Sequence, residues 1–345
     1  MSPDSIRGQR TLLTKDGVRH ALPIFLPVYQ PREPVFQLAR EEIDGCIVNA
    51  YFLYKQRELR ERLTGPSSLK AHVGFAGLIA TDSGAFQGLT RRLYLKNADI
   101  VRFQDRIGSD IISPLDLITP PGDKRTTALG KMRTTHKRVR QALAIVERGL
   151  VAGVQQGGRF LDLRRDSAAY MAELGVEYLA IGSLVPFFNR AHSLAFAGAV
   201  LRDARGLIGA QVPMHVYGAG EPVELPFMVA LGADVFDSSS YAHYARGGWY
   251  MTPYGALAEP GRVMAGEFRC ACPHCAEAPT VEAVFSDFET LKAHNLWTIC
   301  RTVRELRALL DRGGDLNRHL EELLDIHQRW FPESRLGPTW EALHE

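Results

Sequence analysis

The stretch MHVYGAGEPVELPFMVALGADVFDSSS (residues 214–240) begins and ends with a short apolar run that stops at turn residues. Its first run, MHVYGAG (214–220), closes on glycines, and its second, ADVFDSSS (233–240), closes on Asp237 and three serines. Aliphatic and β-branched runs of this length, bounded by turn residues, are typical of buried strands. Outward along the chain, six further runs have the same character: 24–29, 46–52, 77–84, 110–117, 150–158 and 177–184.

Segments with helical character separate most of these eight runs. Examples are residues 126–149, 160–175 and 191–209, and the last two end in glycine, as helix caps do. Strands that alternate with helices over about 240 residues predict a (β/α)8 TIM barrel, with an open doubly wound sheet as the alternative. A hairpin with its turn at Asp16-Gly17 precedes the first strand.

The predicted organisation has two parts. Residues 1–262 would form the catalytic barrel with its N-terminal hairpin, and residues 263–345 a zinc-binding and helical subdomain of the same compact unit. Two long amphipathic patterns, 288–312 and 315–329, supply the helices of the second part.

Composition limits the class of protein. The chain has 345 residues, of which 46% are hydrophobic and 23% charged, as expected for a globular α/β protein. Its polar N-terminus and the lack of an apolar run of about 18 residues favour a cytoplasmic protein without a membrane partner. A net charge of only +2 means that any contact with nucleic acid must be local.

Polar residues stand where the predicted strands end. In a barrel these ends meet at one face, which carries the active site. A single Asp in such a place is usually a turn or cap residue, so the convergence of several is the stronger signal. Two carboxylates suit glycosidic chemistry, and a third with an amide and free backbone N–H groups suits a purine-like base. The set is Asp82, Asp116, Gln156, Gly182, Ser183, Gly218, Gly220 and Asp237.

Two aromatic residues also lie at strand ends. Phe86 and Tyr217 could stack on the two faces of a flat ring, and ordinary packing at the barrel mouth is the alternative.

A cysteine cluster predicts a metal site. The segment CACPHC carries Cys270, Cys272 and Cys275, and His294 follows nineteen residues later. Three thiolates and an imidazole make a closed tetrahedral zinc site, which is structural because no position stays open for water. His274 is a rival fourth ligand.

Several short motifs follow one another along the chain. They are TDSGAFQ (81–87), GVQQGGR (153–159), AIGSL (180–184), VYGAGEP (216–222), DVFDSSSYAHYARGG (234–248), and CACPHC followed by AHNLW (293–297). In this order they resemble the guanine transglycosylases, which replace guanine in tRNA by a 7-deazaguanine. The resemblance covers roughly residues 20–312 and is closest to the archaeosine-type branch, as the segment FDSSSYAHYARGGWYMTP indicates.

The resemblance implies an enzyme of the pentosyltransferase class with assigned residues. Asp237 would be the nucleophile that forms a covalent ribosyl intermediate, and Asp82 the acid and base for the departing and entering rings. The base-binding residues would be Asp116, Gln156, the backbone at Ser183, Leu184 and Gly218, and the aromatic pair Phe86 and Tyr217.

A departure from the queuosine-type enzymes predicts the incoming base. Where those enzymes have a glutamate for an aminomethyl cation, this chain runs GSLVPFF, with Phe187 and Phe188. An apolar wall would leave an ammonium unpaired, so 7-cyano-7-deazaguanine, with its neutral nitrile, is expected.

The nucleic acid and the assembly are less determined. tRNA is favoured, but the sequence stops without the C-terminal RNA-binding domains of the archaeal enzymes, so DNA, as in related bacterial and phage enzymes, is the alternative. A non-catalytic partner subunit and an ordinary sugar hydrolase are further alternatives. The resemblance implies a homodimer or a pairing with an accessory subunit.

Overall fold

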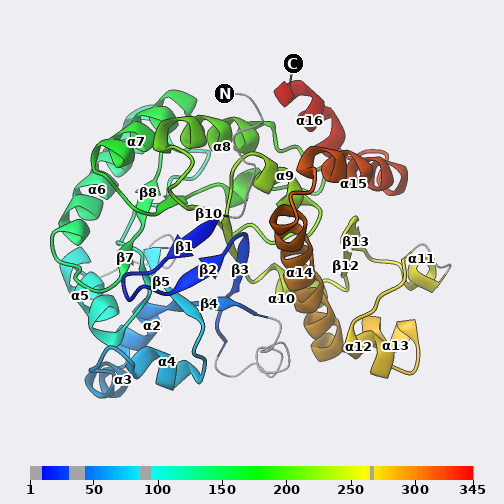
Figure 1. Cartoon of the computed structure of the whole chain (residues 1–345), viewed down its shortest axis with the longest axis horizontal. Coiled ribbons are helices and arrows are strands. Elements are labelled where there is room, and N and C mark those ends of the chain that lie inside the picture. Colours follow the sequence, from blue (N-terminus) through cyan, green and yellow to red (C-terminus); the bar gives the residue numbers. More distant parts are fainter. Residues whose placement is uncertain (1–9, 31–42, 86–94, 265–267, 345) are drawn as a thin grey trace.

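The computed structural model describes residues 10–30, 43–85, 95–264 and 268–344. Each of the eight predicted runs contains a strand (Figure 1). The strands are β3 (Ile24–Pro27), β4 (Gly45–Asn49), β5 (Leu78–Asp82), β6 (Ile111–Ile112), β7 (Leu150–Val151) with β8 (Gly153–Gln155), β9 (Leu179–Ile181), β10 (Met214–Tyr217) and β11 (Val235–Ser238).

These strands form two parallel sheets, with the orders β4-β5-β6-β7 and β3-β11-β10-β9-β8. The run at 150–158 splits because its pairing changes partner. The N–H of Ala152 donates to the carbonyl of Ile112 in one sheet, and the N–H of Gly153 donates to the carbonyl of Tyr178 in the other. On the far side, an isolated parallel bridge joins Val28, after β3, to Ile47 of β4.

Helices follow the strands along the chain and lie outside them in an arc (Figure 1). They are α2 (Ala50–Lys55), α3 (Arg57–Arg62), α4 (Ser68–Val73), α5 (Asn97–Ile107), α6 (Arg125–Leu143), α7 (Leu161–Glu173), α8 (Ala195–Ile208), α9 (Glu224–Ala230) and α10 (Ser240–Arg246).

The strand side chains divide into two apolar layers. Phe25 and Ile79 belong to the larger cluster, which includes residues of the helices. Their neighbours Leu26 and Ala80 belong to a second cluster built almost wholly from strand residues, which we call the inner cluster. This is the alternation that the two faces of a strand dictate.

The N-terminal hairpin lies against the inner cluster. Strands β1 (Thr11–Leu13) and β2 (Arg19–Ala21) pair antiparallel, and the predicted turn is present, with Gly17 at a φ of +86°. The left-handed φ is the reason for a glycine there. Leu12 packs in the inner cluster, so the hairpin covers the amino-terminal ends of the strands.

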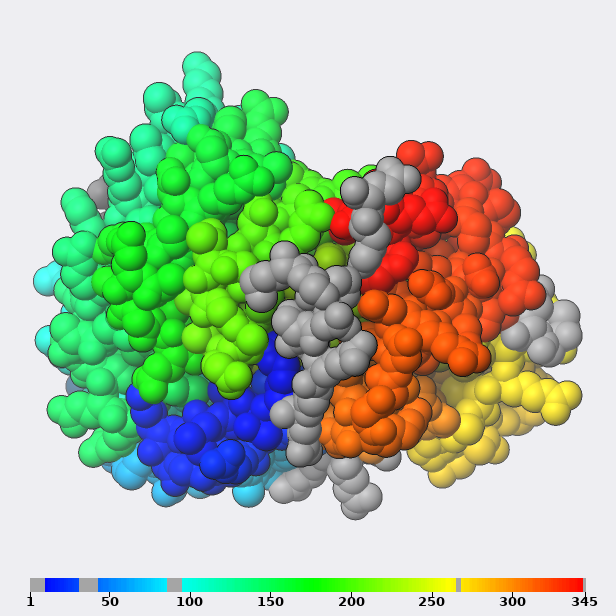
Figure 2. Space-filling view, turned by 45° about the horizontal axis from the view of Figure 1, so that its top comes forward, coloured from blue at the N-terminus to red at the C-terminus, as the bar shows by residue number. Residues whose placement is uncertain are grey.

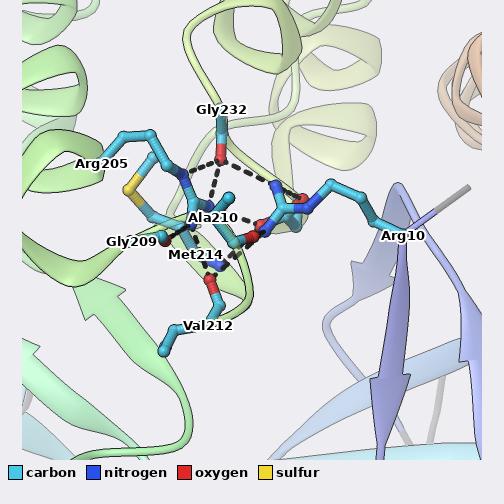
Figure 3. Close-up of polar contacts among 8 residues, drawn as sticks. Arg10, Arg205, Gly209, Ala210, Val212, Met214 and Gly232 are labelled. Carbon is cyan, nitrogen blue, oxygen red and sulfur yellow. Dashed lines mark hydrogen bonds and ion pairs between the residues drawn. The ribbon is translucent and has the colours of Figure 1, made fainter. Parts of the chain in front are cut away.

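An arginine pair ties this hairpin to the strands. Figure 3 shows Arg10 and Arg205 reaching the same group of acceptors. Both form ion pairs with the buried carboxylate of Asp234, at 2.8 Å for Arg205 Nη2 to Oδ2, and both donate to the carbonyl of Gly232. The N–H of Ile24 donates to the carbonyl of Asp234, which places this network at the start of β3 and β11.

The C-terminal part is mostly helical. The two predicted amphipathic helices are present as α14 (Phe288–Asp311) and α15 (Leu316–Trp330). Around them lie α11 (Pro260–Met264), α12 (Pro273–Glu277), α13 (Val281–Ser286) and α16 (Leu336–His344), with an antiparallel hairpin of β12 (Tyr250–Thr252) and β13 (Gly255–Leu257) that the sequence did not predict.

Helix α14 packs against α10 and β12, and α16 packs against α8. Figure 2 shows these C-terminal helices, in orange and red, at one end of the molecule and the green helices at the other. The division at residue 262 stays a prediction. Within the described ranges, no helix has the length and apolarity to cross a bilayer.

Candidate functional site

Asp237 lies near the carboxyl end of β11, in register with Tyr217 on β10. Its side chain is 14% exposed, so the carboxylate is largely enclosed but still accessible. The Oδ1 atom accepts a hydrogen bond from the N–H of Gly218 at 3.2 Å and lies 2.9 Å from Nε2 of His215. A largely enclosed carboxylate with one oxygen held is suited to nucleophilic attack by the other.

Asp82 ends β5, beside Asn49 at the end of β4. Asn49 Nδ2 donates to its Oδ2 at 2.9 Å, and the N–H of Gly84 donates to Oδ1 at 3.1 Å. Desolvation in this enclosed position raises the pKa of Asp82 to about 7, against the Gly84 hydrogen bond and with help from the negative charges of Asp116 and Asp237. A carboxyl with this pKa can both donate and accept a proton near neutral pH.

Asp116 and Gln156 form a buried hydrogen-bonded pair. Gln156 Nε2 donates to Asp116 Oδ2 at 2.6 Å, and Gln156 Oε1 accepts from Ser183 Oγ at 2.8 Å. The N–H of Thr119 in turn donates to Ser183 Oγ at 2.9 Å. This chain fixes the orientation of the Gln156 amide. Burial raises the pKa of Asp116 to about 6, although the Gln156 hydrogen bond and the charge of Arg138 oppose the shift.

The loop after β9 approaches this pair closely. A Cβ at Gly182 would lie 2.5 Å from Gln156 Nε2, so only glycine fits there. Ser183 has a φ of +59°, a strained value for a residue with a side chain. The side chain of Leu184 is buried in the larger apolar cluster, which leaves its backbone as the part that can serve a ligand.

Tyr217 is the last residue of β10, and Gly218 follows it. The hydroxyl groups of Tyr217 and Ser113 share a hydrogen bond of 2.8 Å. Burial raises the pKa of Tyr217 well above its usual range, with smaller contributions from all three site carboxylates. The structure therefore brings Tyr217 close to Asp82, Asp116 and Asp237. Phe86, the other predicted stacking residue, lies outside the described residues.

Sequence reasoning missed two residues of this region. Arg164 on α7 is buried and donates to the carbonyls of Gly158 and Gly182 at 2.9 and 2.6 Å, which holds both loops. His215 lies in the middle of β10 and contacts Asp237. Neither stands at a strand end. For His215 the available signal was a polar residue inside an otherwise apolar strand, whereas Arg164 lies in a helix with several other charged residues, where its burial leaves no local signal.

The predicted metal ligands come together. Nδ1 of His294 lies 3.5, 3.4 and 3.4 Å from the sulfurs of Cys270, Cys272 and Cys275. A tetrahedral ion about 2.3 Å from sulfur and about 2.0 Å from nitrogen separates those atoms by about 3.5 Å. His294 Nε2 lies 2.8 Å from the carbonyl of Met251, which fits a tautomer with Nδ1 free for a metal. The four residues could hold a metal ion, and His274 is not one of the four.

Comparison with known proteins bears on this site. The model of a family described as queuine tRNA-ribosyltransferase matches residues 7–329. The chain is 33% identical to the tRNA-guanine(15) transglycosylase of Methanopyrus kandleri, over 94% of this chain and 71% of that protein. It is 32% identical to that of Pyrococcus abyssi, over 92% and 55%, and 34% identical to that of Haloarcula marismortui, over 92% and 65%. The chain thus spans roughly half to seven tenths of the length of such relatives.

Proposed function

The chain belongs to the queuine tRNA-ribosyltransferase family, and from this premise we propose that it exchanges guanine in tRNA for a 7-deazaguanine. The observation that carries the proposal is the pairing of two different carboxyl groups at the strand ends. Asp237 has one oxygen held by its neighbours, and Asp82 has a pKa of about 7. The relatives' name, tRNA-guanine(15) transglycosylase, supports tRNA as the substrate class.

The proposed fold is a single (β/α)8 barrel. Its support is the change of pairing partner at Ala152, which links the two sheets on one side, and the bridge between Val28 and Ile47 on the other. The inner cluster also takes alternate residues from strands of both sheets, as the interior of a closed barrel requires.

In the proposed mechanism Asp237 attacks the anomeric carbon C1′ of the target nucleotide. The bond from C1′ to N9 of guanine breaks, its electron pair goes to the base, and Asp82 supplies the proton. A covalent ribosyl ester of Asp237 remains. Asp82, now ionised, takes a proton from the incoming base, which displaces Asp237 with net retention at C1′.

The buried Asp116–Gln156 pair is the proposed reader of the base edge. A carboxylate accepts from N–H groups of the base, while the amide and the backbone near Ser183, Leu184 and Gly218 provide donors for its carbonyl oxygen. Tyr217 and Phe86 would enclose the ring plane. Gln156 Nε2 already donates to Asp116 Oδ2 at 2.6 Å, so both side chains are oriented before the base binds.

The incoming base is proposed to be 7-cyano-7-deazaguanine. Val185 is 53% exposed and its Cγ2 would clash with any Cβ at Gly218, so this valine borders the site. Phe187 stacks on Phe196, with ring centroids 4.2 Å apart. Such an apolar border provides no counter-charge for an ammonium and accepts a neutral nitrile.

A structural zinc ion is proposed to be held by Cys270, Cys272, Cys275 and His294. It would fix the segment before α14 and leave no ligand position for substrate.

The assembly is proposed to be a homodimer or a complex with an accessory subunit, in the cytoplasm. DNA as the substrate remains the alternative outcome of the test below. A non-catalytic role is disfavoured because Asp82, Asp116 and Asp237 form one electrostatically coupled group.

The proposal is tested by base incorporation. The purified chain is incubated with 7-cyano-7-deazaguanine and either bulk tRNA or duplex DNA, and digested nucleosides are identified by mass spectrometry. We expect incorporation into tRNA, a loss of about 1,000-fold or more in the Asp237→Asn variant, and wild-type activity in Asp203→Asn, which changes a partly exposed carboxylate on α8. Incorporation into DNA alone, or full activity of Asp237→Asn, would refute it.

A further inference from the structure

His215 lies one layer beneath Asp237 in the interior of the fold. It is in register with Val235 on one side and Ala180 on the other, and both belong to the inner cluster. Side chains in register on parallel strands share a face, so the imidazole points inward, two residues below the edge that carries Tyr217 and Asp237. It is 1% exposed, and its Nε2 lies 2.9 Å from Asp237 Oδ1.

The surroundings of this histidine are otherwise apolar or aromatic. The rings of Tyr178 and Tyr217 meet the imidazole edge-on, with centroids 5.9 and 4.6 Å away. Within the described residues, neither ring nitrogen completes a hydrogen bond of good geometry, although the distance to Asp237 is short enough for one. A buried imidazole costs stability unless it is paired, and the Asp237 carboxylate is the group within reach.

Both contacts of the Asp237 carboxylate fall on the same oxygen. The N–H of Gly218 donates to Oδ1, and Nε2 of His215 lies 2.9 Å from the same oxygen. Among the described residues, no hydrogen bond is made to Oδ2. The two oxygens are therefore inequivalent before any substrate binds. Oδ1 is fixed by the fold, and Oδ2 keeps its lone pairs for another partner.

We propose that His215 is a positioning residue that holds Oδ1 and thereby assigns nucleophilic attack to Oδ2. This inference rests on the proposed role of Asp237. The new bond joins Oδ2 to C1′, the bond from C1′ to N9 of guanine breaks with its electron pair on the base, and the proton comes from Asp82. In this scheme His215 supplies a hydrogen-bond donor to Oδ1 and takes no part in the proton transfer between Asp82 and the base.

The test compares two substitutions of His215 in the full chain. His215→Phe keeps a flat ring and removes the donor, whereas the amide of His215→Gln places an N–H near the position of Nε2. We expect His215→Phe to lower kcat about 100-fold, the effect of a misplaced reacting group. The KM values for tRNA and for the base should change less than about threefold, and Tm should not fall. His215→Gln should recover about tenfold or more of the lost kcat.

The outcomes separate this inference from the proposed function. Asp237→Asn is measured beside both variants, and an active Asp237→Asn would refute the proposed function itself. If the wild type is active and Asp237→Asn is not, full activity of His215→Phe would overturn the inference alone. A parallel loss of Tm and kcat in both variants, without rescue by glutamine, would also overturn it, because it would make His215 a packing residue only.

Discussion

At the scale of single residues, Asp82 and Asp237 are two carboxyl groups near the carboxyl ends of β5 and β11, and their surroundings differ. Asp82 accepts hydrogen bonds on both oxygens, from Asn49 and from the backbone of Gly84. Among the residues that the structure describes, polar contacts to Asp237 reach one oxygen only. The pKa of Asp82 near 7 comes mainly from desolvation, so Asp82 can exchange a proton while Asp237 is suited to bonding with carbon.

This difference predicts the pH dependence of turnover. In the proposed mechanism Asp82 must be protonated to supply the departing guanine, so we expect kcat/KM to fall as pH rises above about 7, by up to about tenfold per pH unit. Replacing Asn49 by Ser removes the amide donor to the ionised carboxyl but keeps a residue able to cap α2.

In Asn49→Ser the ionised form of Asp82 loses stabilisation, so its pKa should rise and the decline of kcat/KM should begin at higher pH. The measurement is the pH profile of kcat/KM for both proteins. A decline at the same pH in both would mean that another group limits the reaction.

At the scale of elements, each run predicted from the sequence contains a strand, but the ends of the strands differ from the predicted ends. The run 110–117 contains a strand of only two residues, because the segment after Ile112 leaves the sheet: the N–H of Leu115 donates to the side chain of Asn97 and that of Leu117 to Thr135. Such side-chain partners lie far away in sequence, and local pattern cannot reveal them.

The same limit applies to the site. Asp82, Gln156 and Asp237 follow apolar runs and were predicted as site residues for that reason. His215 was not predicted, because its contact with Asp237 depends on the register between β10 and β11. The β12–β13 hairpin was also missed, since its strands of three residues are too short for a periodic pattern.

The network at the strand starts gives a prediction for element stability. Asp234→Ala would leave the buried Arg205 without its carboxylate partner. It would also remove the ion pair by which Arg10 joins the hairpin to the strands. We expect a loss of about 3 kcal/mol in the free energy of unfolding, the usual cost of breaking a buried ion pair from one side.

Urea titration followed by circular dichroism would measure this loss. The matched control is Asp162→Ala, whose partner Arg125 is exposed, and its loss should be much smaller because water screens an exposed ion pair. Equal losses in the two variants would show that the Asp234 network contributes no more than a surface pair.

At the scale of the whole molecule, the C-terminal helices and the strands depend on each other through α14. This helix carries His294 of the metal cluster, and the next residue, Asn295, links it to the backbone of Tyr241, Trp249 and Met251. The proposed zinc ion would therefore stabilise the junction between the helical part and the end of the parallel strands.

Metal content distinguishes the two histidines near the cluster. We expect about one zinc per chain in the wild type and in His274→Ala, and a loss of most of the metal in His294→Ala, which removes one of four ligands. Elemental analysis gives the content, and Tm should fall only in the variant that loses metal. Loss of zinc from His274→Ala would show that His274 is a ligand.

The hairpin at the starts of the strands has a practical consequence. It packs on the opposite end of the fold from Asp237, and its residues Leu13 and Val18 are 50% and 47% exposed. A fluorophore or a surface tether attached at Val18 would therefore lie away from the proposed site. Single-molecule recordings of the exchange proposed above are feasible from that attachment point.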